Sequence, residues 1–209
     1  MDQDFISILL GESGVDPGLQ LPDPTLVQYY NDFENRIIWI DEEISSNTLD
    51  VVSKIIYWNR MDKEISIKDR KPIRIFFNSV GGSLDIEEVI VSIIKLSKTP
   101  VYGIALGMVA SAASLIYLSC HRRFALPNSY FILHRGSCTN MSGNYNEVQA
   151  AMEDYKTQIE KMEAFYIENT LYPEEVIKDK IKSDWYIHIE EALEYGIVTD
   201  LIETIDILL

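Results

Sequence analysis

Apolar and polar positions along this chain follow two different periods, and the segments with each period alternate. Short apolar runs rich in Ile, Val, Phe and Tyr predict buried strands, and intervening segments with apolar residues every three or four positions predict helices. The strands are predicted at residues 36–40, 73–79, 101–106 and 124–134, and the helices at residues 45–61, 83–97 and 109–118. Strands that alternate with helices indicate parallel β-α-β units, and therefore an α/β fold.

A longer apolar seam follows. Val148, Met152, Tyr155, Ile159, Met162 and Tyr166 are separated by alternating steps of four and three residues. This spacing predicts one long helix, over about residues 144–170, with an apolar stripe along one side. Its length suggests that it packs against something beyond its own domain, although an ordinary amphipathic surface helix has the same spacing. Two more helices are predicted at 171–181 and 189–197, before residues 198–205 close the chain.

The expected organisation is a single domain at residues 31–209, preceded by a loosely ordered arm at residues 1–30. The first 30 residues carry Gly, Pro and Asp without a clear apolar period. A short apolar stretch at residues 5–10 is preceded by acids rather than by Lys or Arg, so a secretory signal peptide is not expected. A cytoplasmic location is the default expectation.

Charge and cysteine content exclude several classes of protein. The net charge is −15, which would repel a nucleic-acid backbone or an anionic membrane surface. The two cysteines form no Cys-x-x-Cys motif, so neither a disulfide scaffold nor a zinc site is expected, and no metal is predicted. Residues 101–120 are uncharged over about the length of a membrane span. A buried strand followed by a buried helix explains the same residues better, so no membrane segment is predicted.

Candidate chemistry gathers where strands end, which is the usual position of functional groups in open α/β sheets. Gly81-Gly82 follows the second strand, Ser111 follows the third, and His134 ends the fourth. A serine hydroxyl is a weak nucleophile without a base, and His134 is the histidine that ends an apolar strand. The alternative for Ser111 is a small residue that lets helices pack closely, and the alternative for Gly81-Gly82 is a simple turn.

The remaining groups needed for acyl transfer have candidates of differing strength. Asp184, flanked by apolar aromatic residues and expected to be partly buried, is the favoured acid to orient His134, while Asp179 and Asp200 stay open. The backbone N–H groups of Gly82 and Ala112 are candidates for stabilising an oxyanion.

Four motifs taken together resemble the ClpP family of ATP-dependent serine proteases. They are "FFNSVGGS", "GMVASAAS", "FALPNSYFILH" and "EEALEYGIVTD", which occur in the family's order between about residues 36 and 205. The resemblance implies a ClpP/crotonase-like α/β fold of repeated ββα units with a protruding handle helix. It places the nucleophile on Ser111, the base on His134, the acid on Asp184 and the oxyanion amides on Gly82 and Ala112.

The resemblance also implies assembly and partners. Family members form heptameric rings that stack into a tetradecamer, receive unfolded proteins from a hexameric AAA+ Clp unfoldase and cut them into short peptides. No cofactor is expected, because the unfoldase uses the ATP and this chain has no P-loop motif. Two alternatives are a catalytically impaired ring subunit that regulates an active paralogue and a crotonase-type acyl-CoA enzyme. Arg135-Gly136 stands where the family has Gln-Pro, and Val80 where it has Pro.

Overall fold

The computed structural model describes residues 23–136 and 141–205. The chain divides into two units, with the boundary between Arg36 and Ile37, and each is considered by itself. The first unit contributes helix α2 (Pro24–Glu34), whose N-terminus is capped by the Asp23 carboxylate and begins with a proline. The arm expected at residues 1–30 lies mostly outside the described residues, and its last part is helical rather than loosely ordered.

The second unit is built on a seven-stranded sheet. Its main path runs β1 (Ile37–Ile40), β2 (Ile73–Ser79), β3 (Val101–Ala110), β4 (Arg122–Ala125) and β7 (Asp200–Leu201), with every neighbouring pair parallel. Strand β3 is long enough to pair twice: its first half contacts β4 and its second half contacts β5 (Tyr130–Leu133). Strand β6 (Trp185–His188) is antiparallel to β5.

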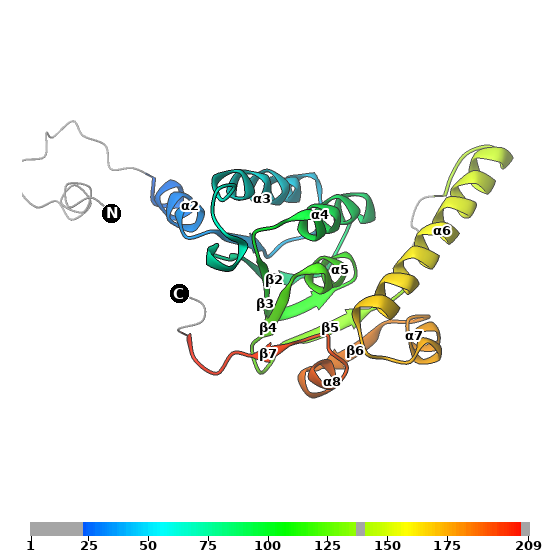
Figure 1. Ribbon diagram of the computed structural model, residues 1–209. Coiled ribbons are helices and arrows are strands. Elements are labelled where there is room, and N and C mark those ends of the chain that lie inside the picture. The colour runs from blue at the N-terminus through cyan, green and yellow to red at the C-terminus, as the bar shows by residue number, and fades with distance from the viewer. Residues whose placement is uncertain (1–22, 137–140, 206–209) are drawn as a thin grey trace, which may run out of the picture. The chain divides into compact units, whose positions relative to one another are not determined.

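Helices connect these strands. Helix α3 (Asp50–Met61) follows a short 3₁₀ turn (Ser46–Leu49), and another such turn lies at Ile67–Asp69. Helices α4 (Leu84–Leu96) and α5 (Ala112–Ser119) follow β2 and β3, and α3, α4 and α5 lie next to one another along the sheet (Figure 1). Helices α6 (Tyr145–Asn169), α7 (Glu174–Lys180) and α8 (Ile189–Glu194) complete the unit.

The core has two layers because both faces of the central strands are apolar. Phe77 on β2 packs edge-on against Tyr117 of α5, with ring centroids 5.5 Å apart and neither side chain exposed. On the opposite face, Phe76 and Ile104 belong to a second buried cluster. Burial on both faces explains why the strand sequences are nearly continuous apolar runs, as parallel sheets require.

The long helix predicted from the apolar seam is present as α6, capped by Asn144 in a capping box with Glu147. Met162 and Tyr166, in its C-terminal half, are buried against the rest of the unit. Met152, in the N-terminal half, is 54% exposed. Figure 1 shows this half of α6 extending away from the sheet and its helices. The seam is therefore covered within the chain over only part of its length.

Two local predictions are wrong and one strand was missed, in each case because pairing between distant parts of the chain decides the local structure. Strand β3 continues to Ala110, where a helix was expected from residue 109, because the end of β3 pairs with both β2 and β5. The strand expected at 124–134, with a bend at its proline, is instead two separate strands, β4 and β5, which pair with different parts of β3. Residues 185–188 form a strand that was not predicted.

The uncharged segment at residues 101–120 consists of β3 and α5, as expected. Within the described ranges, none of the helices has the length and apolar character needed to cross a bilayer.

Candidate active site

Ser111 occupies the sharp turn between β3 and α5. Its backbone has φ 53° and ψ −128°, a left-handed conformation that is strained for a residue with a side chain and typically costs about 1–3 kcal/mol. Its N–H donates to the Ile132 carbonyl at 2.9 Å, which ties the turn to β5. The hydroxyl does not cap the helix that follows. The turn therefore holds the side chain in a fixed position without using its oxygen for the backbone.

His134 reaches Ser111 because of the pairing between β5 and β3. Ala110 is opposite Ile132 in the parallel register, which brings the end of β5 beside the turn after β3. His134 Nε2 is 2.7 Å from Ser111 Oγ. With Nε2 unprotonated, this contact lets the hydroxyl donate its proton to the imidazole.

Asp184 is placed by the unpredicted strand β6. The antiparallel register sets Leu133 opposite Trp185, so the next pair outward is His134 and Asp184. The distance from His134 Nδ1 to Asp184 Oδ1 is 3.0 Å. A proton on Nδ1 donates to this carboxylate, which fixes the tautomer that leaves Nε2 free to accept.

The surroundings of Asp184 differ from the expectation. Its side chain is 57% exposed, so the flanking aromatic residues do not bury it. Trp185 is directed into the core, whereas Asp184, the residue before it, lies at the open edge. The two alternative acids are engaged elsewhere: Asp179 pairs with Lys182 at 2.9 Å, and Asp200 pairs with Arg122 at 2.9 Å.

The other two histidines serve the fold around them. The Nδ1 atom of His121 accepts a hydrogen bond from the Val101 N–H at 2.9 Å. His188 ends β6, with its ring 6.2 Å from that of Tyr130. The structure thus brings one histidine to Ser111, and it is the one that the sequence favoured.

Gly81 and Gly82 form a turn whose backbone conformation residues with side chains rarely adopt. Their φ values are +93° and +151°. A Cβ on Gly81 would lie 2.6 Å from Ser111 Cβ, and a Cβ on Gly82 would lie 2.3 Å from the Ile44 carbonyl oxygen. Glycine is therefore required both for the backbone conformation and for the close approach to Ser111.

Two backbone amides are available beside the hydroxyl. Among the described residues, no acceptor is found for the N–H of Gly82 or of Ala112. Ala112 is the first residue of α5, where an N–H has no partner within the helix and the helix dipole favours negative charge. The Gly81-Gly82 turn lies against Ala112 and Ser111. These amides can bind an oxygen on which negative charge develops.

A second layer of hydroxyl groups supports the turn. Ser114 Oγ donates to the Ser111 carbonyl at 2.6 Å, and the Tyr166 hydroxyl of α6 is 3.4 Å from Ser114 Oγ. Burial raises the pKa of Tyr166 well above its ordinary value, so the phenol stays protonated. The sequence analysis placed Tyr166 in the apolar seam, and nothing in that pattern indicated its hydroxyl contact.

The three side chains and two amides together form an arrangement suited to acyl transfer. Within residues 23–136 and 141–205, no cluster of three or more His, Cys, Asp and Glu side chains has a spacing suited to a metal ion.

Comparisons with known proteins agree on one family. The Clp protease family model matches residues 24–205. The chain is similar to an ATP-dependent Clp protease proteolytic subunit 2 of Treponema denticola, with 31% identity over 65% of this chain and 68% of that protein. The corresponding protein of Treponema pallidum is 28% identical over 81% of this chain and 83% of its own length.

A solved structure gives the same result for the fold. A mutant of ClpP1 from Listeria monocytogenes superposes with a TM-score of 0.73 and 28% sequence identity, covering 87% of this chain and 98% of the other. The expected ClpP-like fold with its long protruding helix is therefore confirmed.

Proposed function

The chain belongs to the Clp protease family, and from this premise we propose that it is an active serine endopeptidase subunit with Ser111 as nucleophile. The observation that carries the proposal is the continuous line of contacts from Asp184 through His134 to Ser111, with distances of 3.0 Å and 2.7 Å. Without a base at this distance, the hydroxyl would be a weak nucleophile.

In the proposed acylation step, Ser111 Oγ attacks the carbonyl carbon of the scissile peptide bond as its proton passes to His134 Nε2. Asp184 stabilises the imidazolium that forms and keeps the ring oriented. The carbonyl oxygen becomes an oxyanion, which accepts hydrogen bonds from the Gly82 and Ala112 amides. Loss of one such donor typically costs about 10²–10³-fold in rate.

The tetrahedral intermediate then breaks its C–N bond. His134 returns the proton to the departing amine, leaving the acyl group esterified to Ser111. Water attacks this ester with His134 as the base, and a second tetrahedral intermediate releases the carboxylic acid and the free hydroxyl. All protons move between Ser111, His134, water and substrate, so the proposed cycle needs no cofactor.

We place this activity inside a ring assembly that receives unfolded protein from a hexameric Clp unfoldase, which would use the ATP. The curated relatives are named as proteolytic subunits of ATP-dependent Clp proteases. The N-terminal half of α6 extends away from the sheet (Figure 1), and Met152 of the apolar seam is 54% exposed there, which supports contact with a second ring. Heptameric rings stacked as a tetradecamer are the proposed form.

Hydrolysis of a fluorogenic peptide by the purified protein tests the proposed activity. The wild-type protein is expected to release the fluorophore, and the Ser111→Ala and His134→Ala variants are expected to lose that activity. Each variant is checked for an unchanged oligomeric state by size-exclusion chromatography. Hydrolysis that persists in Ser111→Ala would contradict the proposed nucleophile.

A further inference from the structure

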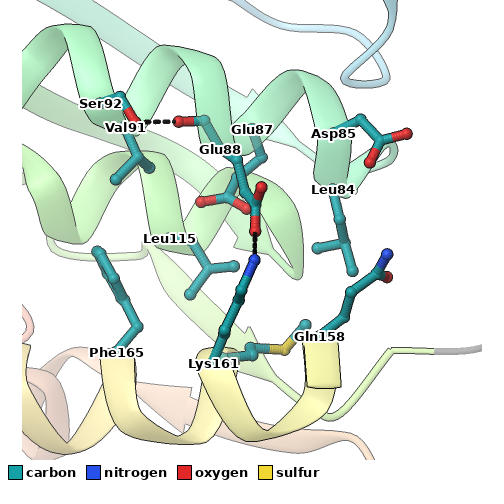
Figure 2. Close-up of a pocket in the computed structure, with 11 residues that line it drawn as sticks. Leu84, Asp85, Glu87, Glu88, Val91, Ser92, Leu115, Gln158, Lys161 and Phe165 are labelled. Carbon is teal, nitrogen blue, oxygen red and sulfur yellow. Dashed lines mark hydrogen bonds and ion pairs between the residues drawn. The ribbon is translucent and has the colours of Figure 1, made fainter. Parts of the chain in front are cut away.

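A pocket of about 230 Å³ lies between α4 and α6, with α5 beneath (Figure 2). Leu84 from α4, Leu115 from α5 and Met162 and Phe165 from α6 supply much of its apolar surface. Sites for drug-sized ligands usually exceed roughly 300 Å³. The pocket is therefore of a size to hold a single amino-acid side chain.

Several residues that line this pocket lie close to the proposed catalytic groups. Leu84 is two residues after Gly82, and Leu115 is one turn after Ser111, with its N–H 3.4 Å from the Ser111 carbonyl oxygen. Met162 Cε lies 3.9 Å from the position that a Cβ on Gly136 would take, and Gly136 is two residues after His134. A peptide bound at Ser111 would thus have this pocket beside its scissile bond.

A buried carboxyl group faces the pocket. Glu87 on α4 lines it and is only 5% exposed. Its carboxyl makes no hydrogen bond or ion pair with any residue in the described part of the chain. In that part of the chain, every fully enclosed side-chain oxygen or nitrogen has a hydrogen-bond partner. Because the Glu87 carboxyl has none, it is not fully enclosed, and it keeps access to solvent through the pocket. Figure 2 shows it directed from α4 toward Leu115.

The nearby lysines are committed to other groups. Lys161 binds Glu88 at 3.0 Å, so that this ion pair links α6 to α4 across the pocket (Figure 2). Lys95 lies over the Phe165 ring, 4.4 Å from its centroid. Burial and the neighbouring Glu88 charge raise the pKa of Glu87 to about 8, and Lys95 only partly offsets them. The pocket therefore holds this carboxyl largely protonated near neutral pH, and a cation brought in by a ligand would stabilise its ionised form.

We propose that the pocket receives a Lys or Arg side chain of the substrate, at the residue whose carbonyl carbon Ser111 attacks, and that Glu87 selects it. This inference rests on the proposed peptidase function. The aliphatic stem of the side chain packs on Leu84, Leu115 and Met162, and its charged end meets the Glu87 carboxylate at the bottom of the pocket.

The expected preference for Lys or Arg can be estimated from the hydrogen bond that such a side chain makes with Glu87 and an apolar one does not. A hydrogen bond that involves a charged group is worth about 10- to 100-fold in affinity. An apolar side chain of the same length fills the pocket but leaves Glu87 without a donor, and sites with buried polar groups reject such analogues. We therefore expect at least a tenfold preference for Lys over norleucine, which has an unbranched apolar side chain.

Matched fluorogenic peptides that differ only in Lys or norleucine before the scissile bond test this selection. The wild-type protein is expected to show a kcat/KM ratio of about tenfold or more in favour of Lys. Glu87→Gln should reduce the ratio about tenfold. Glu64→Gln is the control because it makes the same chemical change at an exposed acid that does not line the pocket. It should keep the ratio within about twofold. A wild-type preference for norleucine, or a ratio that Glu87→Gln leaves unchanged, would overturn the proposal.

Binding to the Ser111→Ala protein separates this inference from the proposed function, because it requires no turnover. Calorimetry compares two product-like peptides that end in Lys or in norleucine. Tighter binding of the Lys peptide, lost on adding Glu87→Gln, supports the pocket even if the wild-type protein hydrolyses nothing. Equal binding of the two peptides overturns the pocket assignment even if hydrolysis is observed.

Discussion

Replacing Glu87 with glutamine is expected to remove a pH-dependent loss of stability from the wild-type protein. Glutamine has nearly the same shape and cannot ionise. The wild-type carboxyl is buried in α4, with Glu88 and Lys95 on the same helix. From α6, Tyr166 interacts with it and Lys161 lines the same pocket, paired with Glu88. Burial and Glu88 raise the pKa of Glu87 from 4.5 to about 8, with Lys95 opposing the rise.

Whether stability rises or falls with pH depends on whether the folded or the unfolded state loses the Glu87 proton at lower pH. The unfolded chain ionises near pH 4.5 and the folded chain near pH 8, so the unfolded state binds fewer protons between these values. Wild-type stability relative to Glu87→Gln is therefore greatest below about pH 4.5, falls as the pH rises, and levels off above about pH 8. At about 1.4 kcal/mol per pH unit the full span corresponds to a ceiling of about 5 kcal/mol. Because the pocket admits solvent, we expect roughly 2–3 kcal/mol.

Urea unfolding at several pH values between 5 and 9 measures this difference, with fluorescence of the buried Trp58 and Trp185 as the signal. Protein concentration is held constant because an oligomer's stability depends on it. Glu64→Gln, at an exposed acid outside the pocket, is the control and is expected to differ from wild type by an amount that does not change with pH. A wild-type-to-Glu87→Gln difference that is flat across this range, or that grows in favour of wild type with rising pH, would refute the reasoning.

Three further changes probe the site. Asp184→Asn is expected to lower kcat/KM for peptides by about 10²–10⁴-fold, as expected for a positioned acid–base system, while the urea midpoint stays within about 0.5 M because this side chain is 57% exposed. Gly82→Ala would place Cβ 2.3 Å from the Ile44 carbonyl oxygen, so we expect loss of activity of at least about 10²-fold together with a lower melting temperature. Tyr166→Phe removes the hydroxyl 3.4 Å from Ser114 Oγ and should cost about 1 kcal/mol in urea unfolding; no measurable loss would show that this contact does not contribute.

Much of the fold could be predicted because the spacing of apolar residues along the sequence indicates which segments are strands and which are helices. The apolar runs gave β1 and β2, and the alternating steps of four and three gave α6 almost to its ends. Prediction failed where long-range pairing decided the outcome. The alanine-rich stretch after residue 106 favours a helix, yet its first part is held as a strand by β2 and β5.

The candidate site likewise has residues that could be predicted from local sequence and residues that depend on long-range pairing. Ser111 and His134 follow apolar strands, so their approach could be expected from the sheet alone. Spacing alone could not separate Asp184 from Asp179 and Asp200, because the four-residue strand β6 that sets it opposite His134 is too short to show a period. The aromatic neighbours and the family resemblance are what favoured Asp184. Glu87 was not predicted at all. Its place three, four and seven residues before Ile90, Val91 and Ile94 puts it on the buried face of α4, and this spacing was a signal that the sequence analysis did not use.

Intact-mass analysis after treatment with a fluorophosphonate tests the central assignment most directly, because this reagent modifies an activated serine hydroxyl and requires no knowledge of substrate. The wild-type protein is expected to gain the mass of one adduct per chain, and Ser111→Ala is expected to gain none. His134→Ala, which keeps the hydroxyl but removes its base, should react far more slowly than wild type. An adduct that persists in Ser111→Ala would contradict the assignment of Ser111 as the nucleophile.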